Sequence, residues 1–304
     1  MTRGAWGLVL LFLLLCLVWG SSFIMMKVAT PVFGGMRVSA YRLLLGGLVL
    51  LPLAVRGWRR SPIRRKHLGA LFVLVTVGNA IPFTVQPFVI HHTGNSAFMG
   101  LMVVFVPVLT IFWSRVLLKT RESRSDWVGV AGGLICLLVM LWDVRALKLG
   151  WLDVVLACSV PVCYSWASTL VKRDLQGIDT AVISAVSLIL AGSCVLVAEI
   201  PMQQVADVGP EPGAQVHALA IWSMLALGIV STGLATVGFF IMINRVSPLY
   251  LSMASYVVPL VAIGWGWLDA EAVSLGQTLA MVFVLVMVAV VQLPTLRARG
   301  GTRS

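Results

Sequence analysis

The feature that most constrains this chain is a pair of long uncharged runs near its C-terminus, joined by a short acidic hinge. The first run covers 246–268 and reads VSPLYLSMASYVVPLVAIGWGWL, and the second covers 272–296. A helix needs about 20 residues to cross the core of a bilayer, so each run is long enough to span it. Because only a short connection with Asp269 and Glu271 separates them, the two runs predict an antiparallel pair of transmembrane helices.

An earlier stretch of the chain follows the same plan. Residues 93–114 form an uncharged run that contains Pro107, and the polar hinge KTRESRSD at 119–126 leads into the apolar run 127–142. Pro107 and Pro259 each follow a valine near the middle of a span, and a glutamate-containing hinge comes after each. This parallel predicts that one half of the chain is a relative of the other.

The composition places the chain in a membrane. Of its 304 residues, 60% are hydrophobic and 11% are charged, whereas soluble domains carry about 25% charged residues. The net charge of +11 could indicate a nucleic-acid partner, but the charges lie in short connections between apolar runs. There they set topology and contact anionic lipid. We therefore expect the lipid bilayer and a small-molecule substrate as partners, and no nucleic acid.

Ten transmembrane spans can be drawn along the chain. Their predicted ranges are 5–27, 37–55, 68–90, 95–115, 127–142, 151–171, 179–199, 217–243, 247–268 and 273–294. The connections between them are short, which predicts a compact helical bundle without a soluble domain. The first run is too long for the core of a signal peptide, so we expect it to remain as the first span.

The distribution of basic residues predicts the orientation of the bundle. With the N-terminus inside, 17 of the 22 lysines and arginines fall in inner segments and four in outer segments. Positive residues accumulate on the cytoplasmic side of membrane proteins. We therefore expect a multi-pass protein of a bacterial-type plasma (inner) membrane with both termini cytoplasmic.

Two short motifs strengthen the relation between the halves. WGSSFIMMK at 19–27 and YSWASTLVK at 164–172 both run from an aromatic residue through small polar residues to a lysine. Five spans in each half is an odd number, so the second half must enter the membrane inverted. The sequence thus predicts an all-α integral membrane protein of ten transmembrane helices, arranged as two inverted five-helix repeats at 1–145 and 146–304. Such repeats are typical of secondary transporters, with the substrate site near the midplane.

Several motifs carry a family resemblance over roughly residues 5–294. They are WGSSFIMMKVA (19–29), YRLLLGGLVLLPLA (41–54), VVFVPVLTIFW (103–113), GVAGGLICL (129–137) and LGIVSTGLATVGFF (227–240). In order and spacing they resemble the drug/metabolite transporter superfamily, specifically its EamA-type ten-helix metabolite exporters. The hinge KTRE departs from the family, which usually has glycine before its glutamate. The resemblance implies export of small metabolites such as amino acids, or of drugs.

Polar and aromatic residues within the spans are the candidates for a substrate site, because polar groups in lipid tend to face the bundle interior or a cavity. In span three, Asn79, Phe83 and Gln86 lie on one helical face. We predict an aromatic-walled site for a neutral or zwitterionic ligand, although the hydroxyls could instead bond their own helices and the aromatic rings could serve packing. The predicted binding residues are Trp19, Asn79, Phe83, Gln86, Tyr164, Ser168, Thr232, Thr236, Phe239 and Tyr256.

Other residues have narrower roles in the prediction. Pro107, Pro161 and Pro259 are predicted hinges. For Arg42, about a turn and a half inside span two, we favour snorkelling or bonds to a neighbouring helix over attraction of a substrate carboxylate. The pair His91-His92 is expected to be solvated in a loop rather than to bind metal or sense pH. We expect neither a metal nor a cofactor.

The function that fits these features is secondary transport by alternating access through a midplane cavity between the repeats. We expect export of small metabolites, with amino acids favoured and bulky apolar or aromatic ones first among them. An importer or a drug exporter of the same fold is the alternative. A channel or an intramembrane enzyme fits less well, because the spans lack a charged ring, paired aspartates or a histidine cluster, and we expect no enzyme activity. A monomer and a homodimer both remain open.

Overall fold

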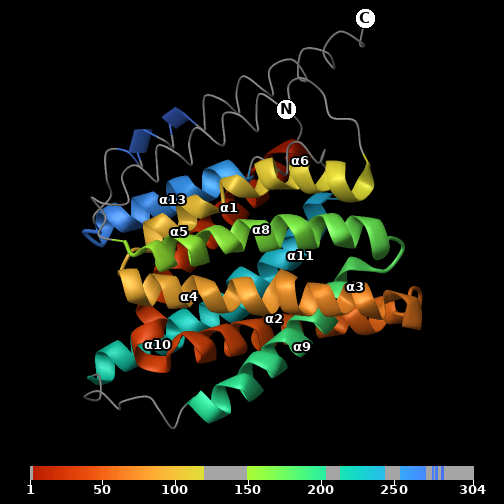
Figure 1. Cartoon of the computed structure of the whole chain (residues 1–304), viewed down its shortest axis with the longest axis horizontal. Coiled ribbons are helices and arrows are strands. Elements are labelled where there is room, and N and C mark those ends of the chain that lie inside the picture. The colour runs from red at the N-terminus through yellow and green to blue at the C-terminus, as the bar shows by residue number, and fades with distance from the viewer. Residues whose placement is uncertain are drawn as a thin grey trace, which may run out of the picture.

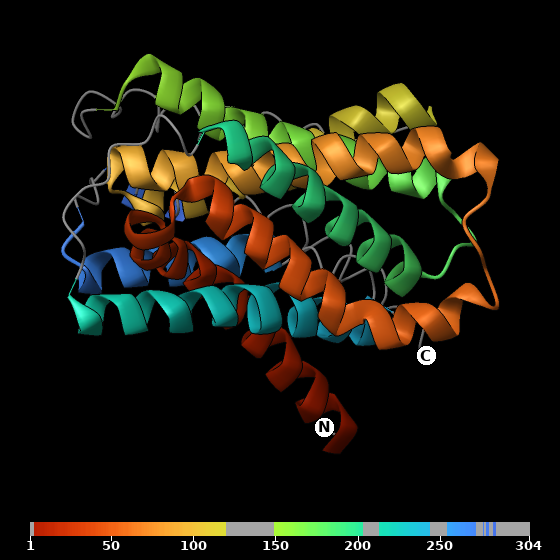
Figure 2. The same cartoon turned by 90° about the horizontal axis from the view of Figure 1, so that it is seen from below.

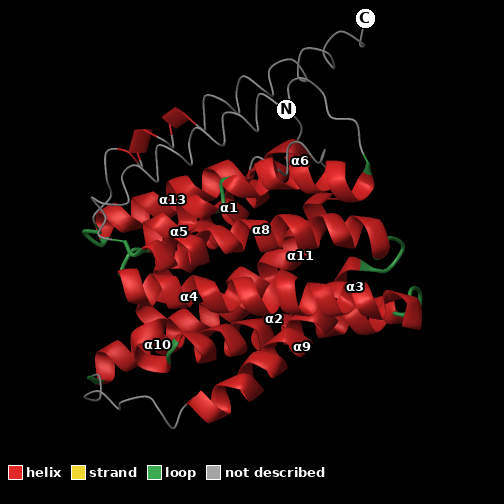
Figure 3. Cartoon of the chain, viewed as in Figure 1, coloured by secondary structure: helices red, strands yellow, loops and turns green. Residues whose placement is uncertain are grey.

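The computed structural model describes residues 3–119, 149–202, 213–243 and 254–271, with five further positions between 276 and 283, and this part is helices and loops without a strand (Figure 3). The helices are α1 (Arg3–Phe33), α2 (Gly35–Trp58), α3 (Leu68–Val73), α4 (Ile81–Thr93), α5 (Ser96–Met102), α6 (Phe105–Leu118), α8 (Trp151–Asp174), α9 (Thr180–Glu199), α10 (Ala214–Leu225), α11 (Ala235–Ile243) and α13 (Ala254–Leu268). Short segments join some of them: 3-10 turns η1 (Arg65–His67) and η4 (Ile200–Met202), and π-helical η2 (Leu74–Ala80) and η5 (Ala226–Leu234).

Seven stretches of the described residues are long and apolar enough to cross a membrane. They are Trp6–Phe33, Gly35–Trp58, Arg65–Thr93, Ser96–Leu118, Trp151–Asp174, Thr180–Glu199 and Ala214–Phe239. These match predicted spans one to four and six to eight, and α13 lies within the predicted ninth span. The predicted fifth span (127–142) and most of the tenth (273–294) lie outside the described residues, so the count of ten stays a prediction.

The first span is longer than its sequence predicted. We expected it to end at residue 27, but α1 continues through Pro31 to Phe33. Lys27 does not end the helix because its ammonium pairs with Asp269 and Glu271, which removes the need to reach water. The helix ends instead at Gly34, whose φ of +79° suits a residue without a side chain.

The spans lie side by side, and their connections gather at two ends of the bundle (Figure 1). At one end α1 meets α2, α4 meets α5, and α13 leads to Glu271; we call this the Glu271 end. At the other end lie the loop after α2, which contains Arg64, and the turn between α8 and α9; we call this the Arg64 end. In Figure 2, α2 and α9 run beside each other and obliquely to the other helices.

Glycines allow α2 and α9 to pack closely. A Cβ on Gly47 of α2 would lie 2.5 Å from the side chain of Ile189. A Cβ on Gly192 of α9 would lie 3.0 Å from the backbone carbonyl oxygen of Ala40 and equally close to the amide nitrogen of Leu44. Small residues at such crossings let helix backbones approach in a membrane, where packing replaces the hydrophobic effect as the force between helices.

The other helix contacts form a regular set. The first span, α1, packs against α13 and against the eighth span, built from α10, η5 and α11. The sixth span, α8, packs against α6 and against the third span, built from η2 and α4. In the same way α2 contacts η5, and α9 contacts η2. These contacts come in three pairs, in each of which one contact is made by a helix of the first half and the other by a helix of the second half.

Both π-helical segments hold a polar side chain in the same way. Asn79 Nδ2 donates a 3.0 Å hydrogen bond to the carbonyl of Leu74, and Thr232 Oγ1 donates a 2.9 Å bond to the carbonyl of Leu227. In each case the acceptor lies five residues earlier in the chain. Single π-helical turns inside α-helices occur frequently at functional sites, so these two segments direct attention to their surroundings.

Of the three predicted hinge prolines, one follows a break in its span and two lie inside continuous helices. The fourth span is interrupted by a turn at Val103 and Val104, between α5 and α6. Pro107 has no N–H to donate to the carbonyl of Val103, which explains the break. By contrast, α8 continues through Pro161 and α13 continues through Pro259. Motion at any of the three stays a prediction.

Candidate functional site

A first group of predicted residues joins α1 to the eighth span. The indole N–H of Trp19 donates a 3.2 Å hydrogen bond to the carbonyl of Ser231. The Trp19 ring also lies 5.9 Å from the ring of Phe239, centroid to centroid, at an angle of 52°. The structure therefore brings two predicted binding residues together across 220 positions of the chain, and a backbone hydrogen bond fixes the indole.

A second group joins α4 to α8. The Gln86 side-chain amide, which is 3% exposed, donates a 3.0 Å hydrogen bond to the hydroxyl oxygen of Tyr164. The Tyr164 ring stands edge-on to Phe83 with centroids 6.2 Å apart. Because the Tyr164 oxygen accepts the Gln86 bond, its own proton remains available to another acceptor. This group combines an aromatic wall with amide and hydroxyl groups.

A proline and a serine position Phe83 in the second group. Pro87 has no N–H, so the carbonyl of Phe83, four residues earlier, loses its usual helical partner. The hydroxyl of Ser39 on α2 donates a 2.5 Å hydrogen bond to that carbonyl. The irregularity in α4 is thus satisfied by a neighbouring helix, which ties α2 to the segment that carries Phe83 and Gln86.

Arg42 lies between the two groups. Its Nε donates a 3.0 Å hydrogen bond to Thr232 Oγ1, and its Cζ lies 4.7 Å from the centroid of the Phe83 ring. Gly46, one turn later on α2, permits this approach, since a Cβ there would lie 2.5 Å from the Thr232 side chain. Arg42 was absent from the predicted binding residues. Of the two structural roles favoured for it, snorkelling is wrong, because 6% of the residue is exposed, whereas a bond to a neighbouring helix is present through the hydroxyl of Thr232. The feature of the sequence that could have identified Arg42 as a site residue is its charge inside an otherwise apolar run.

The remaining predicted residues lie in varied positions. Asn79 is buried and bonds within η2, and Thr236 bonds back to the carbonyl of Thr232. Ser168 is exposed and bonds back to the carbonyl of Ser165, so the structure does not bring it to either group. Tyr256 lies on α13, but its side chain is outside the described part of the structure.

A network of charged residues closes the Glu271 end. The carboxylate of Glu271 lies 2.8 Å from Lys27 Nζ and accepts hydrogen bonds from the backbone N–H groups of Ser96 and Ala97 at the start of α5. Since a helix N-terminus favours a carboxylate, this side chain holds three elements together. At the same end, Arg37 of α2 pairs with Glu199 of α9.

The histidine pair lies in the same region. We expected His91 and His92 in a solvated loop, but both belong to the last turn of α4. His92 Nδ1 lies 2.7 Å from a carboxylate oxygen of Asp153 at the start of α8, although 66% of the His92 side chain is exposed. This contact adds a link between α4 and α8 at the Glu271 end.

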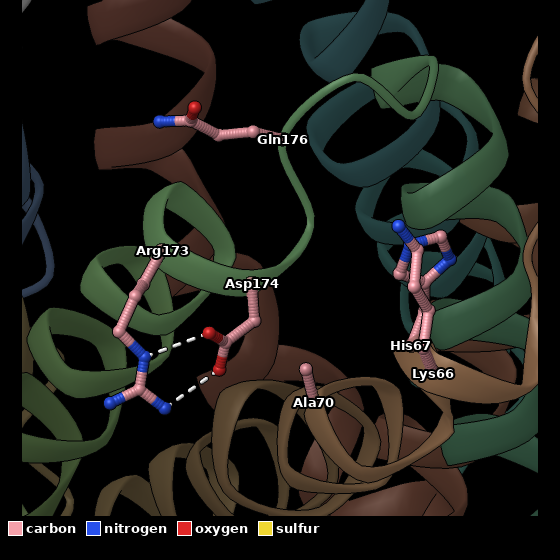
Figure 4. Close-up of a pocket in the computed structure, with 6 residues that line it drawn as sticks. All are labelled: Lys66, His67, Ala70, Arg173, Asp174 and Gln176. Atoms are coloured by element: carbon pink, nitrogen blue, oxygen red, sulfur yellow. Dashed lines mark hydrogen bonds and ion pairs between the residues drawn. The ribbon is translucent and has the colours of Figure 1, made fainter.

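Two pockets of about 350 Å³ each lie away from Arg42. The first is at the Arg64 end (Figure 4), where Arg173, bonded twice to Asp174, faces Lys66 and His67 across an opening above Ala70. Residues of both halves line it, but it is at the tip of the bundle, away from Trp19, Gln86 and Arg42. The second is apolar and is lined by helices α1, α2, α4 and α8 near the Glu271 end, on a different face of α4 from Gln86.

The chain is similar to proteins that are named as membrane transporters and to one protein of known structure. YoaV of Bacillus subtilis (strain 168), which is named an uncharacterized transporter, is 26% identical over 263 residues that cover 83% of this chain and 85% of the relative. YedA of Escherichia coli (strain K12), named an uncharacterized inner membrane transporter, is 25% identical over 287 residues, 90% of this chain and 88% of the relative. A protein of known crystal structure shares the fold with a TM-score of 0.64, at 18% identity, over 98% of this chain and 99% of that one.

The family comparison covers both halves. The model of the EamA-like transporter family matches residues 6–142 and, separately, residues 151–293. Together these matches take in nearly the whole chain, including every helix that contributes to the Trp19, Gln86 and Arg42 contacts. The chain therefore belongs to the EamA-like transporter family.

Proposed function

We propose that this chain is a secondary transporter that exports small metabolites by alternating access, through a site between two inverted five-helix repeats, residues 1–145 and 146–304. Amino acids with bulky apolar or aromatic side chains are the favoured substrates. The observation that carries the proposal is the pair of aromatic and polar groups described above, Trp19 with Phe239 and Tyr164 with Gln86, which lie at matching places in the two halves.

The repeat is supported by the way residues correspond. Tyr164 lies 145 residues after Trp19, and Gly192 lies 145 residues after Gly47. Trp19 and Tyr164 begin the two related motifs WGSSFIMMK and YSWASTLVK, and Gly47 and Gly192 lie at the close contact between α2 and α9. Trp19 contacts the eighth span through Ser231 and Phe239, and Tyr164 contacts the third span through Gln86 and Phe83. The double match of the family model is consistent with this correspondence.

The chemistry of the two groups suits a small organic ligand. Binding sites for such ligands are mostly apolar and aromatic, with a few fixed polar groups that orient the ligand. Phe83, Tyr164, Trp19 and Phe239 supply rings, while Gln86 supplies a buried amide held by a hydrogen bond. Bulky apolar or aromatic side chains are therefore the best match for this surface.

In alternating access, the two ends of the bundle open in turn, so one end must be closed while the other is open. The contacts of Glu271 with Lys27, Ser96 and Ala97 support closure at the Glu271 end. At the Arg64 end, Arg173 pairs with its neighbour Asp174, and the backbone N–H of Asp179 donates a 2.8 Å hydrogen bond to Ser61 Oγ in the loop after α2. We assign this arrangement to a state closed at the Glu271 end, with Pro107, Pro161 and Pro259 as the hinges of the change.

The location follows from the charges and from the relatives. YedA is named an inner membrane transporter, and the basic residues of this chain concentrate in segments such as 56–66 that lie at the Arg64 end. By the positive-inside rule that end faces the cytoplasm. The protein is thus assigned to the bacterial inner membrane with both termini cytoplasmic.

The experiment that tests the function is metabolite release. Cells that overproduce the protein are loaded with a mixed pool of amino acids, nucleobases and sugars, and the medium is compared with that of cells lacking the protein. Selective appearance of apolar or aromatic amino acids is the expected result. Faster uptake of a compound would indicate an importer, and increased resistance to toxic compounds without metabolite release would indicate drug efflux.

A further inference from the structure

Arg42 brings a permanent charge into the interior of the bundle. It lies on α2 in a span of apolar character, and 6% of the residue is exposed. A guanidinium remains protonated in proteins, so the charge persists whatever the surroundings. Charged residues inside membrane spans are costly, and they are usually paired or face a polar cavity connected with function. The contacts of Arg42 therefore decide its role.

The partners of Arg42 are neutral. Its Nε donates to the Thr232 hydroxyl, its Nη1 lies 3.4 Å from the sulfur of Met26, and its charged centre lies over the Phe83 ring. A thioether is a weak acceptor, and an aromatic face attracts a cation without neutralising it. In the part of the chain that the structure describes, no carboxylate pairs with Arg42, and its Nη2 donates to no protein group.

The groups around Arg42 favour an anion over a cation. Tyr164 stands against the same Phe83 ring as the guanidinium, and its hydroxyl keeps a proton to donate because its oxygen already accepts from Gln86. Thr232, by contrast, uses its proton on the carbonyl of Leu227 and offers its oxygen to Arg42. Tyr164 therefore has a proton to donate and Thr232 does not, and the positive charge of Arg42 lies next to both.

We propose that Arg42 binds the carboxylate of the transported molecule, so that the substrates are small organic acids or amino acids and not amines or uncharged compounds. The proposal rests on the transport function proposed above. A planar guanidinium binds a carboxylate through two parallel N–H···O bonds, which gives geometry as well as charge. Because Arg42 contacts Phe83 from one half and Thr232 from the other, a carboxylate bound there lies at the interface that alternating access must rearrange.

Binding to the purified protein in lipid nanodiscs tests this without any transport. The midpoint of thermal unfolding is measured with phenylalanine, 3-phenylpropionate, phenylalaninamide and phenethylamine, and with leucine, 4-methylpentanoate, leucinamide and 3-methylbutylamine. We expect the carboxylates to raise the midpoint and the amides and amines to leave it unchanged. Equal shifts from an amino acid and its deaminated acid indicate recognition of the carboxylate alone, and a shift from the amino acid alone adds the ammonium. Equal stabilisation by amides or amines, or none by any acid, would overturn the proposal.

Variants separate carboxylate binding from a structural role. Arg42→Gln is expected to weaken binding of the stabilising acid about 10- to 100-fold, the value of a hydrogen bond to a charged group. Arg42→Lys keeps the charge but loses the planar fork, so it should retain part of the affinity, and it carries the test if Arg42→Gln does not fold. Arg56→Gln, an exposed arginine on the same helix, is the matched control. Unchanged affinity in Arg42→Lys and Arg42→Gln, with only a lower midpoint in the absence of ligand, would assign Arg42 to structure.

The two proposals fail in distinguishable ways. Acids that bind through Arg42 but are never released by cells would overturn export while leaving carboxylate binding intact. Export with the same KM in wild type, Arg42→Lys and Arg42→Gln would keep the transport function and overturn the role of Arg42.

Discussion

The ammonium of Lys27 on α1 lies 2.8 Å from the carboxylate of Glu271, which is 244 residues further along the chain. The side chain of Glu271 is 1% exposed and that of Lys27 is 25% exposed. Since the same carboxylate accepts the N–H groups of Ser96 and Ala97, one buried residue links the first, fourth and ninth spans. Its removal should loosen the Glu271 end as a whole.

Glu271→Gln tests this link, because the substitution removes the charge and nearly preserves the size. We expect the free energy of unfolding in detergent to fall by about 2 kcal/mol, less than the 3–5 kcal/mol for a fully buried pair because Lys27 is partly exposed. The end should also open more often. Cysteine at Thr30, which is 1% exposed, should then react faster with a water-soluble maleimide when the native cysteines are absent.

The matched control for Glu271→Gln is Asp269→Asn. Asp269 also contacts Lys27, but 46% of its side chain is exposed, and exposed ion pairs contribute little. With Asp269→Asn, the cysteine at position 30 should react with the maleimide at the same rate as in the parent protein. Equal labelling in Glu271→Gln and the parent would show that this carboxylate does not hold the end closed.

The crossing of α2 and α9 predicts that Gly192→Ala is destabilising. Its Cβ would approach the backbone of Ala40 and Leu44 to 3.0 Å, and overpacking of this kind costs about 1–3 kcal/mol. Gly264→Ala is the control, since a Cβ there meets nothing within 4 Å and alanine gains about 1 kcal/mol of helix propensity over glycine. Thermal unfolding in detergent should shift in opposite directions for the two variants. A raised midpoint for both would contradict the close crossing.

The contact of Ser39 with α4 predicts a coupling with Pro87. Ser39→Ala leaves the partly buried carbonyl of Phe83 without this donor, at a cost of about 1 kcal/mol or more. In a Pro87→Ala background the restored N–H can donate to that carbonyl, so the cost of Ser39→Ala should fall below about 1 kcal/mol. The free energies of unfolding of the parent, Ser39→Ala, Pro87→Ala and the double variant give the coupling energy. Additive effects would mean that Pro87 does not create the need for Ser39.

The positive-inside count predicts the topology. A reporter enzyme that is active only outside the cytoplasm, fused to the C-terminus, should be inactive, whereas a cytoplasmic fluorescent reporter should be bright. Insertion of the first reporter between Gly94 and Asn95, at the Glu271 end, should make it active. Activity of the C-terminal fusion would break the ten-span prediction.

The spans were predictable because about 20 apolar residues in a row admit few structures other than a transmembrane helix. The end of α1 was not, because it depends on Lys27 finding partners 242 and 244 residues away. Hydrophobicity reports where a helix enters lipid, but tertiary ion pairs decide how far beyond a charged residue it continues.

The candidate site was predictable in part for a similar reason. Helical spacing placed Phe83 and Gln86 on one face, and the repeated motif indicated Tyr164, yet neither pattern shows that Gln86 bonds to Tyr164. The same spacing placed Ser168 with Tyr164, but spacing fixes a face and not how much of that face neighbouring helices cover. For Arg42, the bond to a neighbouring helix was predicted correctly and the snorkelling was not, because a long side chain has several directions open to it and only packing selects one.

The measurement that tests the central claim most directly is the initial rate of export of the released metabolite by Gln86→Ala and Tyr164→Phe. Both should lower the rate about tenfold or more, at wild-type levels of protein in the membrane, because each removes a polar group from the ligand site. Tyr41→Phe, an exposed tyrosine on α2, should leave it unchanged, while Tyr256→Ala is expected to lower it on sequence grounds. Wild-type rates in both Gln86→Ala and Tyr164→Phe would contradict a substrate site between the halves.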